Sequence, residues 1–376
     1  MRSLVFLFLF AQVIGLLAND AARTKFSFDF LRLTNRHNPG ENLIVAPVGI
    51  HTSLAAMYHQ AQPNVAQELQ TVLGLAPNKQ QVEREVNDLL ASSRSETLSM
   101  VFKLYHARYN GLKRPLLTQS LQDKYQIPVE AVDFEQGQQV ADSANAWVER
   151  VTKSMIKNLY AADDFSEQDS MMLLNVLTMN ATWDIPFITK DTKKDVFHFA
   201  NGDHSVDMME TRGNFNYCEI SKFEAVELAY EAHTDLAMLI IMPNSAEPFE
   251  SALKHLDASV YEEINRKLTS HWTLDVHLPK FSITKKTKAN NILQQMGLSA
   301  VFQDDAFEAN HRLSSIEQNG RIDVTEQGTT AAVVTETRMV FRSGAIDVPI
   351  NRPFVYLVRK QSTKEIMFIG YYAYYQ

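Results

Sequence analysis

The sequence has almost no cysteine: Cys218 is the single one among 376 residues, which excludes an intramolecular disulfide. A fold without disulfides must be held together by its hydrophobic core. Apolar residues make up 45% of the chain, enough for a sizeable core. Because Phe215 and Tyr217 stand close to Cys218, we expect a buried small side chain there, not a reactive thiol.

Positive charge is also scarce. The formal net charge is -8, whereas a nucleic-acid-binding protein normally presents a basic face. We interpret the short basic cluster Lys285, Lys286 and Lys288 as a solvated segment. Nucleic acid is therefore not an expected partner.

Enzyme motifs are missing as well. The sequence contains no Gly-x-Ser-x-Gly elbow, P-loop, Gly-x-Gly-x-x-Gly or His-Glu-x-x-His. The 11 histidines show no metal-ligand spacing. We therefore predict no catalytic residues, no metal site and no cofactor.

Nothing divides the chain into parts beyond its N-terminal segment. Residues 1–18 have the pattern of a secretory signal peptide: Arg2, an apolar run over 4–17, and the small residue Ala18 at the preferred cleavage point. Gly15 is a second possible cleavage point, and a buried N-terminal helix fits the pattern poorly. No repeat, low-complexity tract or Pro/Gly-rich linker follows, which predicts one domain over 19–376.

The N-terminal run is too short to span a bilayer comfortably, so we expect a secreted, extracellular protein without a membrane span. Asn180 belongs to the only Asn-x-Ser/Thr sequon and is a candidate glycosylation site if it is exposed.

Hydrophobic periodicity predicts both helices and strands. Seven apolar residues recur at helical spacing, namely Val140, Ala144, Trp147, Val148, Val151, Met155 and Leu159. Residues 50–57 also look helical, entered through Pro47. Short apolar runs over 171–179, 236–242 and 354–358 are rich in strand formers. Helices dominate the first half and strands the second, which predicts an α+β fold with extensive antiparallel sheet.

The most informative stretch lies between residues 323 and 350. Residues 329–335 are all small or β-branched, which favours a strand, although alanine and threonine anchor a core poorly. With a period of two, one face stays uncharged and the other carries Glu336 and Arg338. The segment could enter a sheet with its uncharged face inward. On the pattern alone, an ordinary edge strand is at least as good an interpretation.

Several different short motifs follow one another along the chain. They are residues 42–47 with Ile50, then Val132, Asp133 and Phe134, then Asn145, Trp147, Val148 and Thr152, then Asn175, Trp183, Phe187, Thr192 and Phe197, then 278–281, 296–298, 351–355 and 368–370. Each motif is weak alone, but their joint order over more than 300 positions resembles the serpin family. The resemblance implies a single large domain and a monomer. It also implies a main antiparallel-rich sheet, further sheets, surrounding helices and an exposed reactive loop at about 328–350.

The resemblance also implies a mechanism. In this family a serine protease attacks the reactive loop and forms an acyl-enzyme, and the loop then inserts into the main sheet as a new strand. Such a protein is a suicide substrate and not an enzyme. Insertion requires a hinge without bulky or charged inward-facing residues. The hinge residues implied here are Glu326, Gly328, Thr329, Thr330, Ala331, Ala332, Val333, Val334 and Thr335. The two valines are bulkier than the alanines that the family prefers, so we expect slightly slower insertion.

The scissile bond follows from counting. In inhibitory members the primary specificity residue usually lies fourteen positions after the hinge glycine, and Gly328 leads to Arg342, followed by Ser343. Counting back from the C-terminal motif gives the same register. Because arginine can pair with the carboxylate in a trypsin-like primary pocket, we predict a trypsin-like serine protease as the partner. Arg338 fits neither count, and Phe341 is the weaker alternative, for a chymotrypsin-like enzyme.

Further positions carry over from the family. Glu326 and Lys280 are similar to the pair that closes the top of the main sheet near Trp183, although an ordinary surface ion pair is the alternative. Asn175 matches the polar cluster where the sheet opens. The usual serines and histidine of that cluster are replaced, by Ala46, Gly49 and Gln318. We hypothesise that these departures lower the stability of the native state or ease spontaneous loop insertion.

A glycosaminoglycan site is not supported. Residues 79–94, basic in some relatives, mix both signs: Lys79, Arg84 and Arg94 with Glu83, Glu85 and Asp88. The alternative function is a non-inhibitory binding or carrier protein on the same fold, cleaved as a plain substrate.

Overall fold

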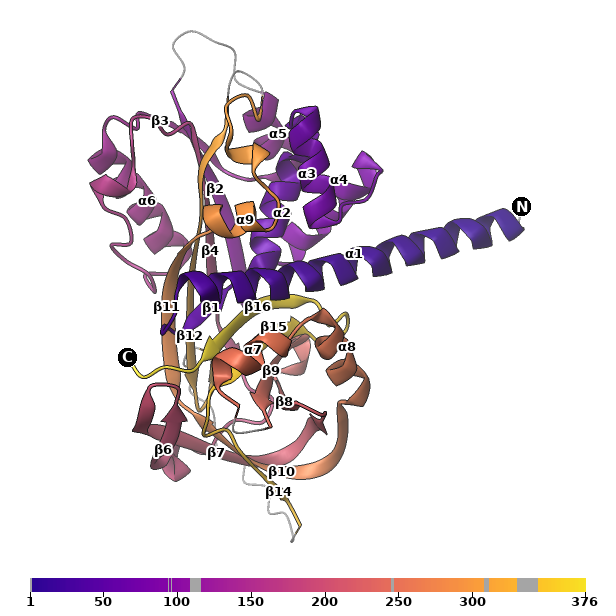
Figure 1. Cartoon of the computed structure of the whole chain (residues 1–376), viewed down its shortest axis with the longest axis vertical. Helices are drawn as coiled ribbons and strands as arrows, with labels where there is room; N and C mark the ends of the chain where they lie inside the picture. Colours follow the sequence, from indigo (N-terminus) through magenta and orange to yellow (C-terminus); the bar gives the residue numbers. More distant parts are fainter. Residues whose placement is uncertain are drawn as a thin grey trace.

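The computed structural model describes residues 2–93, 95, 97–108, 116–244, 247–307, 311–329 and 344–376, with side chains from Asp20 onward except at 271 and 272. Two sheets and the helices around them form an elongated body (Figure 1). One sheet runs through the upper half of the view, with α6 on one side and α2 to α5 on the other. The second sheet and helices α7 and α8 form the lower half, and α1 crosses between the halves.

The upper sheet has seven strands in the order β3-β2-β4-β12-β13-β5, with β11 pairing to β12. The strands are β2 (Leu98–Ala107), β3 (Val129–Val132), β4 (Met171–Met179), β5 (Ala181–Thr182), β11 (Phe281–Lys288), β12 (Leu313–Thr325) and β13 (Gly328–Thr329). The β2–β3 and β4–β12 pairs are parallel and the others antiparallel. β4 and β12 hydrogen-bond directly, from Met171 opposite Leu313 to Thr178 opposite Arg321. We call this β4–β12 boundary the seam.

The lower sheet has nine strands in the order β1-β16-β15-β9-β8-β7-β10-β14, with β6 pairing to β7. They are β1 (Leu43–Val45), β6 (Lys193–Phe199), β7 (Gly202–Glu219), β8 (Phe223–Ala229), β9 (Leu236–Pro243), β10 (Thr269–Pro279), β14 (Ile346–Pro349), β15 (Phe354–Lys360) and β16 (Ile366–Tyr372). β4, β9 and β15 confirm the three strands predicted from apolar runs. β14 comes after the predicted start of the reactive loop and pairs in parallel with β10 at the sheet edge.

The helices lie mainly in the first half of the chain, as predicted. They are α1 (Arg2–His37), α2 (Pro47–Met57), α3 (Pro63–Leu73), α4 (Lys79–Ser92), α5 (Leu116–Tyr125), α6 (Gly137–Val151), α7 (Phe249–His255), α8 (Ala258–Lys267) and α9 (Asn290–Gln295). Short 3-10 turns are η1 (Tyr58–Gln60), η2 (Ala162–Asp164), η3 (Thr189–Asp191), η4 (Ala232–Thr234) and η5 (Ala300–Phe302). Every residue of α2 is buried, so this helix forms the centre of the upper half. Pro47 occupies a first-turn position, where its missing N–H costs nothing.

The predicted stripe of α6 was too long. The helix buries Val140, Ala144, Trp147 and Val148, as expected, but it ends at Val151, so Met155 and Leu159 are not part of it. Lys153 and Ser154 have φ values of 50° and 65°, which break the helical path. The hydroxyl of Thr152 accepts a hydrogen bond from the Ile156 N–H at 3.1 Å and stabilises this break.

The connection from α6 to β4 crosses the seam. Tyr160 and Met155 of this connection bind side chains of β12: Asn319 Nδ2 donates to the Tyr160 hydroxyl at 2.8 Å, and Arg321 Nη1 to the Met155 carbonyl at 2.9 Å. Where the connection enters β4, the Ser170 N–H donates to the Ser314 hydroxyl at 2.8 Å. The chain segment before β4 is thereby tied to β12.

Cys218 lies in β7 and is buried, which confirms the prediction made for it. Burial raises the pKa of its thiol to about 11, so the thiol is protonated and unreactive at neutral pH. Among the residues that the structure describes, no helix is long and apolar enough to cross a membrane.

Candidate functional site

The start of the predicted reactive loop is a short strand inside the upper sheet. β13 lies antiparallel between β12 and β5, with Thr329 opposite Val324 on one side and Ala181 on the other. β5 follows β4 after a single residue, so β13 stands where the seam ends. Because β13 runs back against β12, its chain direction is toward the seam.

Gly328 is required by the close approach of β13 to β5. Its φ is +147°, and a Cβ built there would lie 2.0 Å from the carbonyl oxygen of Ala181. No side chain fits at that distance, so any other residue would push β13 away from β5. The hinge glycine therefore serves this fit as well as the flexibility expected from the sequence.

Thr329 is fully buried and is bound by a tyrosine that sequence reasoning missed. Its hydroxyl lies 2.8 Å from the Tyr230 hydroxyl, and the Tyr230 ring stacks on Trp183 with centroids 4.3 Å apart. Trp183 Nε1 donates to the Thr325 carbonyl at 3.0 Å, and its backbone N–H to the Gln327 carbonyl at 3.0 Å. No local pattern marks Tyr230, because it meets Thr329 only through the tertiary fold.

Glu326 joins the turn between β12 and β13 to two neighbouring segments. Its carboxylate accepts hydrogen bonds from Lys280 Nζ at 2.9 Å and from the Thr192 hydroxyl at 3.1 Å. Burial alone would raise the pKa of Glu326, but these hydrogen bonds outweigh it and lower the pKa below the ordinary value of 4.5. The structure thus brings Glu326, Lys280 and Trp183 together at the β13 end of the seam, as the family resemblance implied.

Asn175 lies in the middle of β4, directly against α2. A Cβ on Gly49 would lie 2.2 Å from Asn175 Nδ2, so the glycine makes room for this amide. Asn175 is fully buried, and neither its Nδ2 nor its Oδ1 has a hydrogen-bond partner among the described residues. Such a buried amide lowers the stability of the native state.

Gln318, the neighbour of Asn175 across the seam, replaces the family's usual histidine with a different connection. Its Oε1 accepts from the Ala46 N–H at 2.9 Å, and its Nε2 donates to the Ala46 carbonyl at 3.0 Å. Gln318 is 1% exposed and Ala46 fully buried. This pair of hydrogen bonds attaches β12 to the first turn of α2.

The remaining predicted positions divide into two groups. Asn180 is exposed between β4 and β5, which meets the condition for glycosylation set by its sequon. The bond Arg342–Ser343 and hinge residues 330–335 lie outside the described residues.

A family model described as "Serpin (serine protease inhibitor)" matches residues 21–374, nearly the whole chain. The chain belongs to the serpin family. The leukocyte elastase inhibitor of Sus scrofa is 26% identical over 380 residues, covering 93% of this serpin and 98% of that inhibitor.

Solved structures confirm the predicted fold. Serpin48 of the insect Tenebrio molitor superposes with a TM-score of 0.84 at 24% identity, covering 96% of this chain and 99% of its own. Human thyroxine-binding globulin gives a TM-score of 0.86 at 21% identity, covering 96% and 100%. A highly specific serpin and a thyroxine-binding globulin thus share this fold. The fold alone does not separate inhibition from binding.

Replacing Gln318 with alanine removes two buried hydrogen bonds and leaves the Ala46 N–H without this acceptor. We expect the free energy of unfolding to fall by about 2–3 kcal/mol, measured by urea unfolding at an unchanged m-value. The matched change Gln67→Ala, on the exposed face of α3, should alter stability by less than about 0.5 kcal/mol. If the Gln318→Ala protein is as stable as the parent, the two hydrogen bonds make no net contribution to the free energy of unfolding.

Gly328→Ala should displace β13 from β5, because the new Cβ clashes with Ala181. Hydrogen exchange over residues 181–182 and 324–329 should become faster. The control is Gly40→Ala, since Gly40 also has a positive φ, +80°, but no atom within 4 Å of the added Cβ. That control should cost about 1–2 kcal/mol of strain without changing exchange at the hinge. Unchanged exchange in Gly328→Ala would contradict the close approach.

The lowered pKa of Glu326 predicts a pH-dependent contribution to stability. Since the folded pKa lies below the unfolded value of 4.5, the contribution is fully present above 4.5 and is lost as the pH falls through the folded pKa. The wild-type protein should therefore unfold at a higher temperature than Glu326→Gln at pH 7, and the difference should shrink in acid. Glu167→Gln, at an exposed position, should show no such trend. If the unfolding temperatures of the wild-type and Glu326→Gln proteins differ equally at pH 7 and below pH 4, the Glu326 carboxylate does not contribute through its pairing with Lys280.

Proposed function

We propose that this serpin is a secreted inhibitor that traps a trypsin-like serine protease covalently by cleavage at Arg342–Ser343 and loop insertion. The position of β13 carries the proposal. Gly328 and Thr329, the first two residues of the predicted reactive loop, already form a strand antiparallel to both neighbours at the end of the seam. Insertion of the cleaved loop then extends an existing strand, and no first pair of strand residues has to form in the sheet.

Extension of β13 along the seam is favourable because it replaces one parallel ladder by two antiparallel ladders, which are slightly more stable per residue. Thr329 indicates which face turns inward, because its side chain is fully buried against Tyr230. A period of two then assigns Ala331, Val333 and Thr335, all uncharged, to that buried face.

The chemistry at the scissile bond belongs to the protease. Its serine oxygen attacks the carbonyl carbon of Arg342, the bond to the Ser343 nitrogen breaks, and the released amine takes up a proton. Arg342 remains attached to the protease as an ester. Trapping requires insertion to finish before water hydrolyses this ester, which is why the small, uncharged hinge supports inhibition over simple cleavage.

Secretion rests on two further features. Residues 1–18 have the signal-peptide pattern, and Asn180 is exposed, as a glycosylation acceptor must be. Mass analysis of protein secreted by eukaryotic cells would detect both the new N-terminus and the glycan.

The purified protein mixed with trypsin should give a complex that survives denaturing electrophoresis, together with a released peptide that begins at Ser343. Arg342→Ala should abolish the complex, because the trypsin pocket loses its cation, whereas Arg338→Ala should retain it. Cleavage after Arg342 without a stable complex would mean that the loop is only a substrate.

Two neighbouring valines give a matched control for insertion. Val333→Arg places a charge on the predicted inward face, so trypsin should still cleave the protein but escape. Val334→Arg places the same charge on the outward face and should still trap. If both variants trap equally, the assigned faces are wrong.

A further inference from the structure

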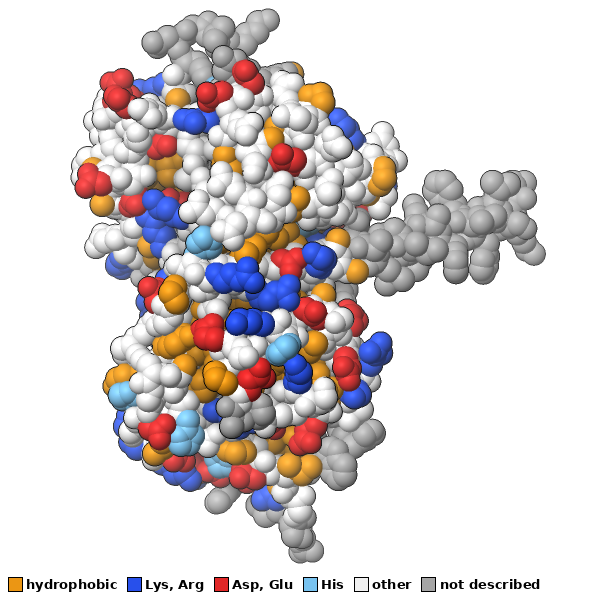
Figure 2. All heavy atoms as spheres, in the orientation of Figure 1, with side chains coloured by type: hydrophobic (Ala, Val, Ile, Leu, Met, Phe, Trp, Pro, Cys, Tyr) orange, Lys and Arg blue, Asp and Glu red, His pale blue; other side chains and the backbone are white. Residues whose placement is uncertain are grey.

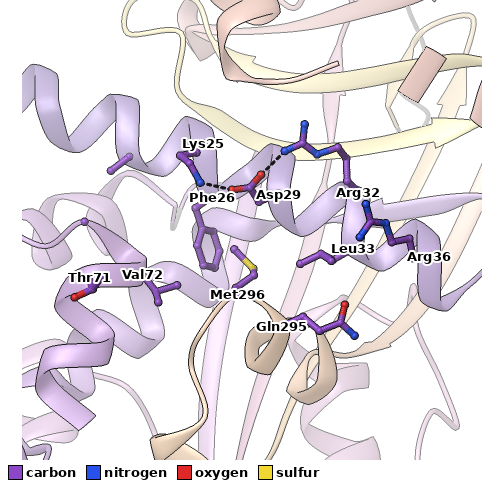
Figure 3. A pocket seen from close by; sticks show the side chains of 12 residues that line it. Lys25, Phe26, Asp29, Arg32, Leu33, Arg36, Thr71, Val72, Gln295 and Met296 are labelled. Carbon is purple, nitrogen blue, oxygen red and sulfur yellow. Dashed lines mark hydrogen bonds and ion pairs between the residues drawn. The ribbon is translucent and has the colours of Figure 1, made fainter. Parts of the chain in front are cut away.

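A groove runs along the described part of α1, on the side facing α3 and the segment after α9 (Figure 3). Its volume is about 520 Å³, within the range of about 300–1,000 Å³ of small-molecule sites. The α1 residues that line it recur every three or four positions: Ala22, Lys25, Phe26, Asp29, Arg32, Leu33 and Arg36. One continuous face of the helix therefore forms one wall. None of the predicted hinge or sheet-opening residues lines this groove, so it is separate from the inhibitory site.

The floor of the groove is apolar and preformed. Phe26 and Leu33 come from α1, Val72 from α3, and Met296 from the residue after α9. The Phe26 side chain is only 2% exposed, and its ring packs edge-on against His51 at 5.5 Å. The floor of the groove therefore does not need to rearrange to receive a ligand.

The rim of the groove carries an excess of positive charge. Lys25, Arg32 and Arg36 face one carboxylate, Asp29, which binds both Lys25 Nζ, at 2.5 Å, and Arg32. Figure 3 shows these two interactions as dashed lines. Arg36 is exposed and forms no ion pair with any carboxylate of the described residues. The rim thus has two uncompensated positive charges in a chain whose net charge is -8.

The same cations continue onto the neighbouring surface. Arg32 and Arg36 also line a second hollow with Lys254. Figure 2 shows lysine and arginine side chains gathered where α1 crosses the middle of the molecule. The second hollow also contains a carboxylate, Glu250, whereas the groove between α1, α3 and Met296 combines its cations with the apolar side chains of Phe26 and Val72.

We propose that this groove binds a small amphipathic organic anion, an apolar chain with a single carboxylate. The guanidinium of Arg36 pairs with the ligand's carboxylate, because its fork matches the two oxygens and none of the described carboxylates forms an ion pair with it. The apolar chain of the ligand lies over Leu33, Val72 and Met296. A neutral chain would leave the cation unpaired, and a purely polar anion would leave the floor exposed to water.

Decanoate, with decanol as the uncharged molecule of equal chain length, tests both parts of the proposal. Met296 supplies a local signal when the methionine methyl groups carry carbon-13, and Met296→Leu identifies its NMR resonance. Decanoate should shift this resonance saturably, and decanol should bind at least about tenfold more weakly, the loss expected for one charge-assisted hydrogen bond. Arg36→Gln should weaken decanoate binding to a similar degree.

Lys254→Gln is the matched control, since Lys254 is an exposed cation of the second hollow and does not line the groove. It should leave decanoate binding unchanged. The proposal is overturned if the Met296 resonance does not shift, if decanol binds as tightly as decanoate, or if Lys254→Gln weakens binding and Arg36→Gln does not. Because the groove is separate from the hinge, protease trapping should be the same in Arg36→Gln and in the parent, so this test and the trapping test fail independently.

Discussion

Direct parallel pairing of β4 with β12 is the interaction on which the other parts of the site depend. β13 and its turn lie at one end of this seam, Asn175 and Gln318 face each other across its middle, and Ser170 and Ser314 meet near its other end. A strand that enters between β4 and β12 must break the pairing of these two strands, and each side-chain contact across the seam must either break or move with one of them. The seam therefore contributes to the stability of the native state and opposes the insertion that we propose.

Sequence reasoning reached the fold because the serpin motifs extend over the whole chain, and their order does not depend on any single residue. It also placed Glu326, Lys280 and Trp183 correctly as neighbours. It did not predict that Tyr230 binds Thr329, since the two are far apart in the chain and no periodic pattern connects them. Periodicity also failed after Val151, because two residues with positive φ ended a helix whose apolar spacing continued.

Gln318 shows why a departure from a family pattern is not simply a loss. Losing the usual serines and histidine suggested a weaker polar cluster, and the buried Asn175 amide without partners agrees with that expectation. The glutamine, however, makes a two-point connection to the Ala46 backbone. Its amide oxygen and nitrogen lie side by side on one carbon, whereas the donor and acceptor nitrogens of a histidine ring point in diverging directions. The polar cluster around Asn175 is weakened, and the two hydrogen bonds from Gln318 to Ala46 replace part of its contribution to stability.

The distances across the seam also determine what must move during insertion. Adding a strand places β4 and β12 about 4.8 Å further apart. Two hydrogen bonds join the α6–β4 connection to β12, from Arg321 to Met155 at 2.9 Å and from Asn319 to Tyr160 at 2.8 Å. Neither bond survives that displacement unless the connection moves with β12. If the connection follows β12, its bond from Ser170 to Ser314 is kept, and the chain bends instead where it enters β4 at Met171. A strand that extends from β13 meets Arg321 first and Ser314 last. The resistance to insertion is therefore distributed along the seam and does not lie at the hinge alone, where Gly328 and Thr329 already occupy the sheet.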